Sequence, residues 1–299
     1  MASNELRVGF IGMGIMGAPM AMNCLKAGFA LTVHNRSRAP VDELAREGAT
    51  PAASSKEVAE QSDVIITMLP DSPDVEAAVL GEGGVIEGVS AGDVVIEMST
   101  IAAGVGRRVA AALAEKDVAM LDCPVSGGPQ GAEAGSLSIM CGGPKAAFDQ
   151  CLPILEVMGG RIEHFGDSGS GYMAKLCNQV GCVITIQAVC EVLALAAKAG
   201  LDTRKVLDVV GSGLAASRIM ELHGPKMLER DYAPGFRLAL QEKDLRLVAA
   251  AADDLEMPLP ATALVHQLIR SLSAKGKGDL GTQALVLAME HLADCEVKG

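Results

Sequence analysis

The stretch that decides the fold lies near the N-terminus and reads Val8-Gly9-Phe10-Ile11-Gly12-Met13-Gly14-Ile15-Met16-Gly17. Its first four residues are mainly apolar and predict a buried β-strand. Residues 18–27, which follow it, are rich in Ala, Met and Leu and predict a helix. A glycine-rich turn between a strand and a helix is the arrangement that holds a dinucleotide pyrophosphate.

Each glycine of this turn has a physical reason to be glycine. Gly12 allows the tight turn, Gly14 lets the backbone approach the phosphates, and Gly17 lets the helix pack closely on the strand. The helix N-terminus then offers free N–H groups and a positive dipole end to the anion. Because 34 of the 299 residues are glycine, the spacing alone is weak evidence. The strand–turn–helix context therefore carries the prediction of nicotinamide or flavin dinucleotide binding.

Beyond this turn, short apolar runs alternate with helical patterns. The patterns predict strands at 31–34, 64–69, 94–98, 119–122, 137–141 and 161–165, and helices at 41–47, 55–61 and 104–116. Continuous apolar strands separated by helices indicate a mostly parallel sheet covered on both faces. A glycine-rich segment, 166–171, ends the pattern. We therefore predict a Rossmann-type α/β domain over residues 1–166.

The second half of the chain predicts helices only. The expected helices span 171–199, 203–212, 220–230, 238–254, 260–274 and 281–294. We predict an all-helical domain for substrate binding and oligomerisation over residues 167–299, joined to the first by the long helix. Segment 180–200 is apolar enough to resemble a membrane span, but Gln187 and Glu191 lie in its middle. These polar residues favour a buried helix in a soluble core or a subunit interface.

The composition argues against several kinds of partner. The net charge of −12 argues against nucleic acid and an anionic membrane surface, although a local pocket can still bind a small anion. The eight Cys form no C-x-x-C pair and the five His share no metal-like spacing, so we predict no metal site. Reduced, mostly buried thiols and a short polar segment before the first strand predict a cytoplasmic protein.

The residues after the second predicted strand bear on which dinucleotide binds. An acidic residue that binds the adenine ribose of NAD is expected about 20 residues past the glycine turn. This chain instead has Asn35, Arg36 and Ser37, which offer an amide, a planar cation and a hydroxyl suited to a phosphate. We therefore predict a preference for NADP(H) over NAD(H). The alternative is that Arg36 and Arg38 are solvated surface charges and that NAD is used.

A second glycine turn follows the predicted strand 119–122 and contains Ser126-Gly127-Gly128. A serine followed by two glycines exposes successive backbone N–H groups and one hydroxyl. Such a group is suited to binding a carboxylate. The alternative is an ordinary turn from a strand into a loop.

Lys175 lies on the long predicted helix, with Asn178 and Gln179 three and four residues later. Residues at this spacing share one helix face. The face is otherwise apolar, where a lysine is costly unless it has partners or a chemical task. An ammonium could protonate a developing alkoxide, and an amide could hold the substrate oxygen. The alternative is a lysine whose stem covers apolar surface while its head reaches water.

The chain as a whole resembles the β-hydroxyacid dehydrogenases, the family that includes 3-hydroxyisobutyrate dehydrogenase and, more distantly, 6-phosphogluconate dehydrogenase. Four motifs carry the resemblance, in the family's order and spacing. They are the turn at 9–17, the segment 122–128, the helix start at 169–179, and Lys243-Asp244-Leu245. The resemblance covers nearly the whole chain and implies an NAD(P)-dependent oxidoreductase that transfers hydride between the nicotinamide and a small 3-oxo or 3-hydroxy carboxylic acid.

The resemblance also implies roles for individual residues. Lys175 would be the general acid that protonates the aldehyde oxygen, and the base in the reverse direction. The substrate carboxylate would be held by Ser126, Gly127 and Gly128. Substrate and lysine would be oriented by Asn178 and Gln179.

The residues expected to contact the cofactor come from both halves of the chain. They are Gly12, Met13, Gly14, Ile15, Met16, Gly17, Asn35, Arg36, Ser37, Met68, Leu69, Pro70, Thr100, Phe236 and Lys243. The resemblance implies that Phe236 and Lys243 approach from the helical domain and close over the nicotinamide.

The chain departs from the family pattern at two places. Many members have Asn four residues after the catalytic lysine, where this chain has Gln179 with Asn178 beside it. Many members also have an Asp-x-Ser pattern before the final helix, where this chain has Gly281-Thr282-Gln283. The second departure weakens any transfer of substrate contacts from that region.

Several loops favour one substrate within the family. Segments 68–75, 80–88, 213–217 and 234–236, together with Asn178-Gln179, resemble the tartronate semialdehyde reductases. We therefore expect reduction of 2-hydroxy-3-oxopropionate (tartronate semialdehyde) to glycerate. The alternatives are 3-hydroxyisobutyrate oxidation, and reduction of succinic semialdehyde or glyoxylate. A non-catalytic nucleotide-binding scaffold is a more distant alternative, since a fold does not fix a function.

The long apolar helix also bears on assembly. Its surface exceeds what one subunit is expected to cover, so we predict a homodimer or homotetramer built through the helical domains.

Overall fold

The computed structural model describes residues 6–299, so the first five residues of the predicted N-terminal domain lie outside the described part. The chain divides into two compact units, Met1–Lys175 and Leu176–Gly299. The first is a Rossmann-type α/β unit and the second is helical, as the sequence predicts. The division falls within one long helix, α8 (Ser170–Lys198), whereas the sequence-based boundary at 166/167 lies just before that helix.

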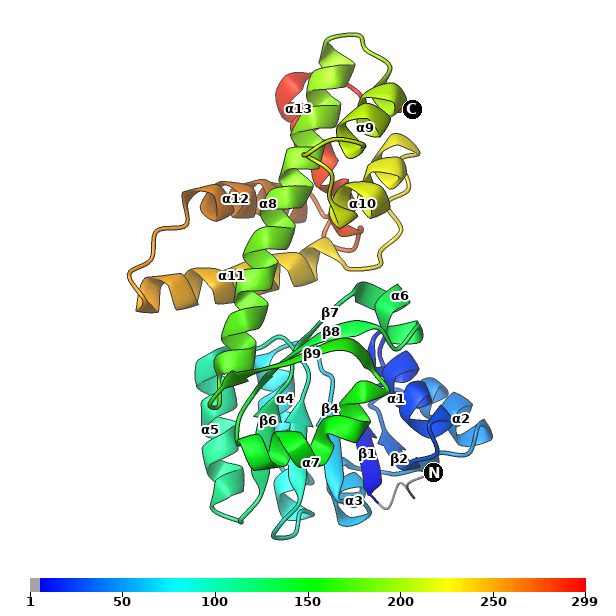
Figure 1. Ribbon diagram of the computed structural model, residues 1–299, viewed down its shortest axis with the longest axis vertical. Coiled ribbons are helices and arrows are strands. Elements are labelled where there is room, and N and C mark those ends of the chain that lie inside the picture. Colours follow the sequence, from blue (N-terminus) through cyan, green and yellow to red (C-terminus); the bar gives the residue numbers. More distant parts are fainter. Residues whose placement is uncertain (1–5) are drawn as a thin grey trace. The chain divides into compact units, whose positions relative to one another are not determined.

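Among the described residues, nine strands of the first unit form one sheet (Figure 1). They are β1 (Arg7–Ile11), β2 (Ala30–His34), β3 (Thr50–Pro51), β4 (Val64–Thr67), β5 (Val94–Glu97), β6 (Ala119–Asp122), β7 (Val125–Ser126), β8 (Leu137–Gly142) and β9 (Gly159–Gly166). The first six run parallel in the order β3-β2-β1-β4-β5-β6. β8 pairs antiparallel with β6 and β7, and parallel with β9. The sheet is therefore mostly parallel, as predicted.

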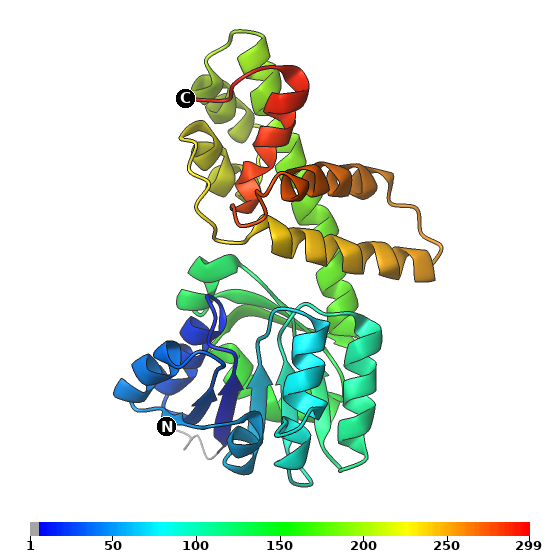
Figure 2. The ribbon, with the colours of Figure 1, turned by 180° about the vertical axis from the view of Figure 1, so that it is seen from behind.

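Helices cover both faces of this sheet (Figure 1 and Figure 2). Its helices are α1 (Gly17–Lys26), α2 (Ala39–Arg46), α3 (Ser55–Glu60), α4 (Ser72–Leu80), α5 (Ala103–Ala114), α6 (Gly128–Glu133) and α7 (Lys145–Glu156). Alternate strand residues enter two separate cores. Val64 and Ile66 of β4 pack in the core with Met20 of α1, whereas Ile65 packs with Val75 of α4. Burial on both sides explains why these strands are continuous apolar runs.

Three helices of the first unit are absent from the sequence-based prediction: α4, α6 and α7. For α4, the residues Asp71-Ser72-Pro73 look like the end of a strand. In the structure Asp71 is the N-cap and accepts a hydrogen bond from the Ser72 N–H at 2.7 Å, while Pro73 lies in the first turn. Proline is tolerated there because a first-turn N–H has no helical partner. α6 contains Gly128 and Pro129, and α7 contains an internal proline, Pro153.

The second unit contains the rest of α8 and five further α-helices. They are α9 (Thr203–Gly211), α10 (Arg218–Leu228), α11 (Leu238–Asp254), α12 (Pro260–Ala274) and α13 (Val286–Ala293). The final predicted helix, 281–294, is split into a 3₁₀ turn, Thr282–Leu285, and α13. α11 packs on α12, and α12 on α13.

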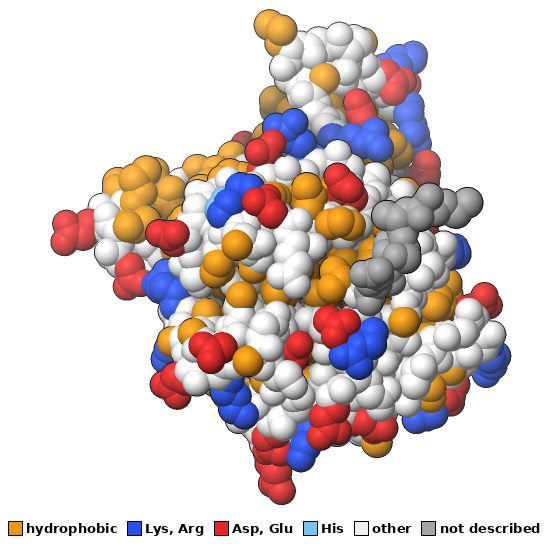
Figure 3. Space-filling model, turned by 60° about the horizontal axis from the view of Figure 1, so that its bottom comes forward, with side chains coloured by type: hydrophobic (Ala, Val, Ile, Leu, Met, Phe, Trp, Pro, Cys, Tyr) orange, Lys and Arg blue, Asp and Glu red, His pale blue; other side chains and the backbone are white. Residues whose placement is uncertain are grey.

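Within residues 6–299, one helix, α8, is long and apolar enough to cross a membrane, with a mean hydropathy of 2.1 in its most apolar window. Inside the second unit it also carries buried polar contacts. Gln187 is buried and its Nε2 donates to Glu191 Oε1 at 2.9 Å and to Met289 Sδ at 3.2 Å. A core helix of a water-soluble protein passes the same test of length and composition. On the face shown in Figure 3, Lys and Arg side chains lie among Asp and Glu side chains.

Candidate functional site

The predicted cofactor residues of the first unit lie along one edge of its sheet. The glycine turn, Asn35–Ser37, the loop Met68–Pro70 and Thr100 follow β1, β2, β4 and β5 in turn, at the carboxyl ends of parallel strands. Strand order reverses direction between β1 and β4, because β2 lies on the other side of β1. Open parallel sheets bind ligands outside such a reversal. The edge is therefore the candidate dinucleotide site.

Two glycines of the turn leave no room for a side chain, whereas a third borders open space. Gly12 has φ +101°, and a Cβ there would lie 2.3 Å from the Met68 carbonyl oxygen. A Cβ on Gly17 would lie 1.8 Å from the Gly12 carbonyl oxygen. A Cβ on Gly14 would meet nothing within 4 Å. Gly14 therefore borders open space just before α1, at the place where a turn of this type holds a pyrophosphate.

Asn35 helps to build the turn. Its Oδ1 accepts a hydrogen bond from the Met13 N–H at 3.0 Å. Its Nδ2 donates to the carbonyl oxygen and to the hydroxyl of Ser37, at 3.0 and 2.7 Å. The side chain thus joins the end of β2 to the glycine turn, a role that the sequence does not indicate.

The two arginines beyond β2 have different surroundings. Arg38 pairs with Asp42 at 2.7 Å. Arg36 is exposed and forms no ion pair within the part of the chain that the structure describes. Arg36 is therefore the cation of the two that remains for a phosphate group.

The turn that contains Ser126 leads from β7 into α6. Gly127 and Gly128 have φ of +138° and +63°, conformations that favour glycine. Ser126 pairs with Ser138 of β8 and is half-buried. The two glycines are thus required by the backbone, whichever ligand the turn binds.

Asp122 anchors the start of α8 on the end of β6. Its Oδ1 accepts a hydrogen bond from the Gly169 N–H at 2.8 Å, and its Oδ2 accepts one from the Tyr172 N–H at 3.0 Å. A Cβ on Gly171 would lie 2.3 Å from the Asp122 carbonyl oxygen, so the glycines allow this close approach. Lys175 follows within the next turn of α8 and is only 7% exposed. The carboxylate therefore fixes the helix end that carries the lysine.

A buried carboxyl, Glu97 at the end of β5, continues this network. Its Oε2 accepts a hydrogen bond from the Tyr172 hydroxyl at 2.7 Å, and its Oε1 accepts one from the Ser99 N–H at 2.8 Å. Ser99 Oγ in turn accepts a hydrogen bond from the Leu69 N–H at 2.7 Å. The network thus links the loop Met68–Pro70 to the start of α8.

Burial affects both carboxyls of this network. It raises the pKa of Glu97, and hydrogen bonds from Ser99 and Tyr172 oppose that effect. It also raises the pKa of Asp122, which backbone N–H groups of Gly169 and Tyr172 oppose. Neither acid was predicted as part of the site, although both end buried apolar strands, where an acidic residue needs partners.

The Tyr172 hydroxyl provides a test of this network. Tyr172→Phe is expected to lower the free energy of unfolding by about 1–3 kcal/mol, because it leaves the buried Glu97 carboxyl without one donor. Urea unfolding followed by circular dichroism measures the loss. Tyr232→Phe is the matched control, since the Tyr232 hydroxyl is buried with no hydrogen-bond partner among residues 6–299. Equal losses in the two variants would contradict the assigned role.

In the second unit, the predicted residues Gln179 and Lys243 meet at Asp244. Gln179 Nε2 donates to Asp244 Oδ2 at 2.6 Å, and Lys243 Nζ lies 2.8 Å from Asp244 Oδ1. All three side chains are buried. Asn178 Nδ2 donates to Gln179 Oε1 at 2.9 Å. Asp244 belongs to a motif that the sequence singles out, but its contact with Gln179 was not predicted.

Phe236 is partly exposed, and its backbone is held by the segment that departs from the family pattern. The Phe236 carbonyl oxygen accepts hydrogen bonds from both the N–H and the hydroxyl of Thr282, each at 2.9 Å. Gln283 Nε2 donates to the carbonyl oxygens of Asp231 and Ala233. Gly281–Gln283 therefore shapes the loop before α11. The expected closure of Phe236 and Lys243 over the nicotinamide stays a prediction.

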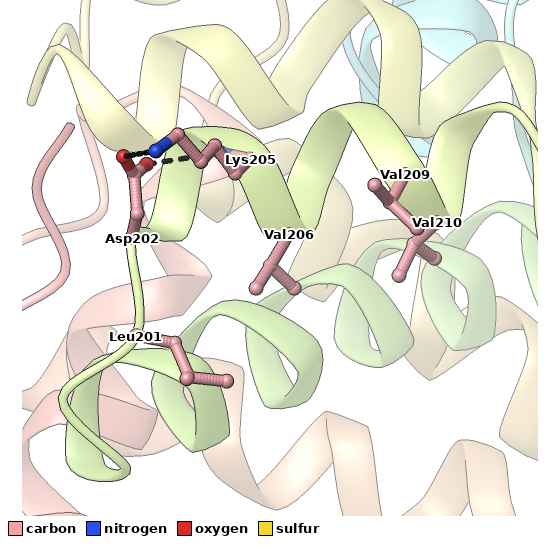
Figure 4. A pocket seen from close by; sticks show the side chains of 6 residues that line it. All are labelled: Leu201, Asp202, Lys205, Val206, Val209 and Val210. Carbon is pink, nitrogen blue, oxygen red and sulfur yellow. Dashed lines mark hydrogen bonds and ion pairs between the residues drawn. The ribbon is translucent and has the colours of Figure 1, made fainter.

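A hollow of about 330 Å³ lies elsewhere in the second unit, beside α9 (Figure 4). It is lined by Leu201, Asp202, Lys205, Val206, Val209 and Val210. Its two charged side chains pair with each other, because Lys205 Nζ lies 3.6 Å from Asp202 Oδ2. None of the predicted site residues lines this hollow.

Comparison with known proteins finds family matches for both halves of the chain. Residues 7–166 match the family described as the NAD binding domain of 6-phosphogluconate dehydrogenase, and residues 169–289 match the NAD-binding domain of NADP-dependent 3-hydroxyisobutyrate dehydrogenase. The chain is 41% identical to 2-hydroxy-3-oxopropionate reductase of Escherichia coli K12 over 290 residues, 97% of this chain and 99% of that protein.

Two solved structures have the same fold over nearly the whole chain. A 3-hydroxyisobutyrate dehydrogenase from Salmonella typhimurium superposes with a TM-score of 0.88 at 31% identity, covering 95% of this chain and 99% of that one. Psf3, solved in complex with NADP+ and a ligand designated 2-OPP, superposes with a TM-score of 0.86 at 26% identity, covering 94% and 99%.

Proposed function

Because the chain belongs to the β-hydroxyacid dehydrogenase family, the family of 3-hydroxyisobutyrate dehydrogenase, we propose that it reduces 2-hydroxy-3-oxopropionate to glycerate with NADPH. One observation carries the reaction type: a buried lysine, Lys175, lies in the same compact unit as the glycine turn and Ser126-Gly127-Gly128. The similarity to 2-hydroxy-3-oxopropionate reductase over 97% of the chain supports the choice of substrate.

The proposed reaction divides the work among these residues. NADPH, when bound along the sheet edge, supplies the hydride. The Lys175 ammonium donates a proton to the aldehyde oxygen as the C–H bond forms, and accepts it again in the oxidative direction. Ser126 and the N–H groups of Gly127 and Gly128 hold the substrate carboxylate. Asn178 and Gln179 orient the substrate and the lysine.

A panel of small 3-oxo and 3-hydroxy acids, assayed with both cofactors, tests the substrate. We expect the highest kcat/KM for 2-hydroxy-3-oxopropionate with NADPH. A higher value for 3-hydroxyisobutyrate oxidation, or for succinic semialdehyde or glyoxylate reduction, would replace the proposed substrate within the same reaction type. No turnover with any member of the panel would contradict the proposed function.

Arg36 carries the proposed preference for NADP(H). Arg36→Ala is expected to lower kcat/KM for NADPH about tenfold, because a charge-assisted hydrogen bond to the 2′-phosphate is lost, and to leave the value for NADH nearly unchanged. Arg38→Ala is the matched control, since Arg38 already pairs with Asp42. If the ratio of kcat/KM for NADPH to kcat/KM for NADH is the same in Arg36→Ala as in the wild type, this arginine does not select NADP(H).

We also propose a cytoplasmic homodimer or homotetramer that binds neither nucleic acid nor membranes. Exposed apolar side chains of the second unit support self-association, among them Leu195, Leu201 and Val209, which are 72%, 58% and 71% exposed. Analytical ultracentrifugation measures the mass in solution, and a monomer at micromolar concentration would contradict the proposal.

A further inference from the structure

A chain of side-chain contacts in the second unit leads from a buried ion pair to Asn178. Lys243 Nζ lies 2.8 Å from Asp244 Oδ1, and Asp244 Oδ2 accepts a hydrogen bond from Gln179 Nε2 at 2.6 Å. Gln179 Oε1 accepts one from Asn178 Nδ2 at 2.9 Å. Asp244 is 1% exposed, Gln179 4% and Lys243 7%. Water therefore has little access to rearrange these contacts.

The chemistry of each group determines which partner donates and which accepts in each of these hydrogen bonds. A carboxylate only accepts hydrogen bonds, so Gln179 must turn its NH₂ toward Asp244. The carbonyl oxygen of the same amide then lies toward Asn178, and it can only accept. Asn178 must therefore turn its own NH₂ toward Gln179. The orientation of both amides therefore follows from the Asp244 carboxylate.

This order determines what Asn178 can offer to a substrate. Its NH₂ group donates to Gln179 Oε1 and also reaches Cys182 Sγ at 3.5 Å, so both of its hydrogens have acceptors. The carbonyl oxygen is the end of the amide that remains for the reaction. Asn178 follows Lys175 by three residues on the continuous helix α8, and residues at that spacing are neighbours on a helix surface.

We propose that Asp244 is a positioning residue, which acts through Gln179 to make Asn178 a hydrogen-bond acceptor beside Lys175. An acceptor suits the lysine ammonium and the hydroxyl of a 3-hydroxy acid, which are donors, but it does not suit the carbonyl oxygen of an aldehyde. The aldehyde oxygen is thus left to the Lys175 ammonium. The inference rests on the proposed function. Gln179 contacts Asp244 and orients Asn178, and Asn178 offers the acceptor beside Lys175.

Asp244→Asn tests this role because it exchanges the donor and the acceptor in each of the two amide hydrogen bonds. The introduced amide has one oxygen, and the Lys243 ammonium is a stronger donor than the Gln179 amide. The oxygen then turns to Lys243, and the NH₂ group turns to Gln179. Gln179 rotates in response, Asn178 follows, and Asn178 presents a donor. At saturating substrate and cofactor, kcat is expected to fall about tenfold, the effect of losing one hydrogen bond to a charged group.

A double-mutant cycle with Lys243→Met separates this role from a merely structural one. Without the ammonium, the oxygen of the introduced amide is available to Gln179, and the native orientation returns. Asp244→Asn is therefore expected to lower kcat about tenfold in the wild-type background but less than twofold in the Lys243→Met background. Equal losses in the two backgrounds, or no loss in the wild-type background, would overturn the proposal.

A measurement without turnover keeps this test separate from that of the proposed function. In protein labelled with ¹⁵N in Asn and Gln side chains, the NH₂ resonances of Asn178 and Gln179 should shift in Asp244→Asn and return toward their positions in the double variant. If Asp244→Asn does not fold, Gln179→Leu leaves the ion pair intact and should shift the Asn178 resonance. Unshifted resonances would overturn the inference. Shifted resonances together with no turnover of any substrate in the panel would contradict only the proposed function.

Discussion

Lys175→Met is expected to lower kcat by about 10²–10⁴-fold while NADPH still binds, because general acid catalysis contributes a factor of that size. Methionine keeps the length of the side chain and suits its surroundings, since Lys175 is only 7% exposed. The loss should therefore fall on the chemical step and leave the fold intact. Steady-state kinetics on the best substrate of the panel and a fluorescence titration with NADPH measure the two effects.

Lys198→Met is the control for this experiment. Lys198 lies at the other end of α8 and is exposed, and its Nζ donates to the backbone carbonyl oxygen of Asp294 at 3.1 Å. Its replacement should leave kcat unchanged. Turnover retained in Lys175→Met would exclude Lys175 as the acid. An unreactive wild-type chain that still binds NADPH would favour the non-catalytic nucleotide-binding scaffold.

The sequence predicts the sheet well because the same physical cause produces both the pattern and the fold. Strands buried on both faces are mainly apolar, so the runs at 31–34, 64–69 and 94–98 can be recognised without any knowledge of tertiary structure. The missed helices have mixed signals. In α4, a proline that marks the end of a strand also starts a helix, and only the cap formed by Asp71 distinguishes the two.

The candidate site is only partly predictable for a different reason. Gly12, Ser126 and Lys175 are found because turns and helix faces have short repeating spacings. The residues that hold them in place act across long separations: Tyr172 contacts Glu97 75 residues away, and Gln179 contacts Asp244 65 residues away. No local pattern records such a pair. Asn35 illustrates the converse, since a residue assigned to the cofactor from its position also joins β2 to the glycine turn.

Within the six residues of the glycine turn, some substitutions are expected to lower stability and another to lower the affinity for NADPH. Gly17→Ala is expected to lower the free energy of unfolding by about 3 kcal/mol, because its Cβ would lie 1.8 Å from the Gly12 carbonyl oxygen, a backbone atom that cannot move aside easily. Urea unfolding measures this loss. Gly12→Ala should also be destabilised, since Gly12 has φ +101°.

Gly14→Ala should behave in the opposite way. Its Cβ meets no protein atom within 4 Å, so the unfolding free energy should match that of the wild type. The same methyl group would occupy the space at the start of α1 where the pyrophosphate is expected, and the affinity for NADPH should fall at least tenfold, about 1.4 kcal/mol. Isothermal titration calorimetry measures the affinity. Unchanged affinity in a well-folded Gly14→Ala would mean that the dinucleotide does not approach this turn, and the assignment of the sheet edge would fail with it.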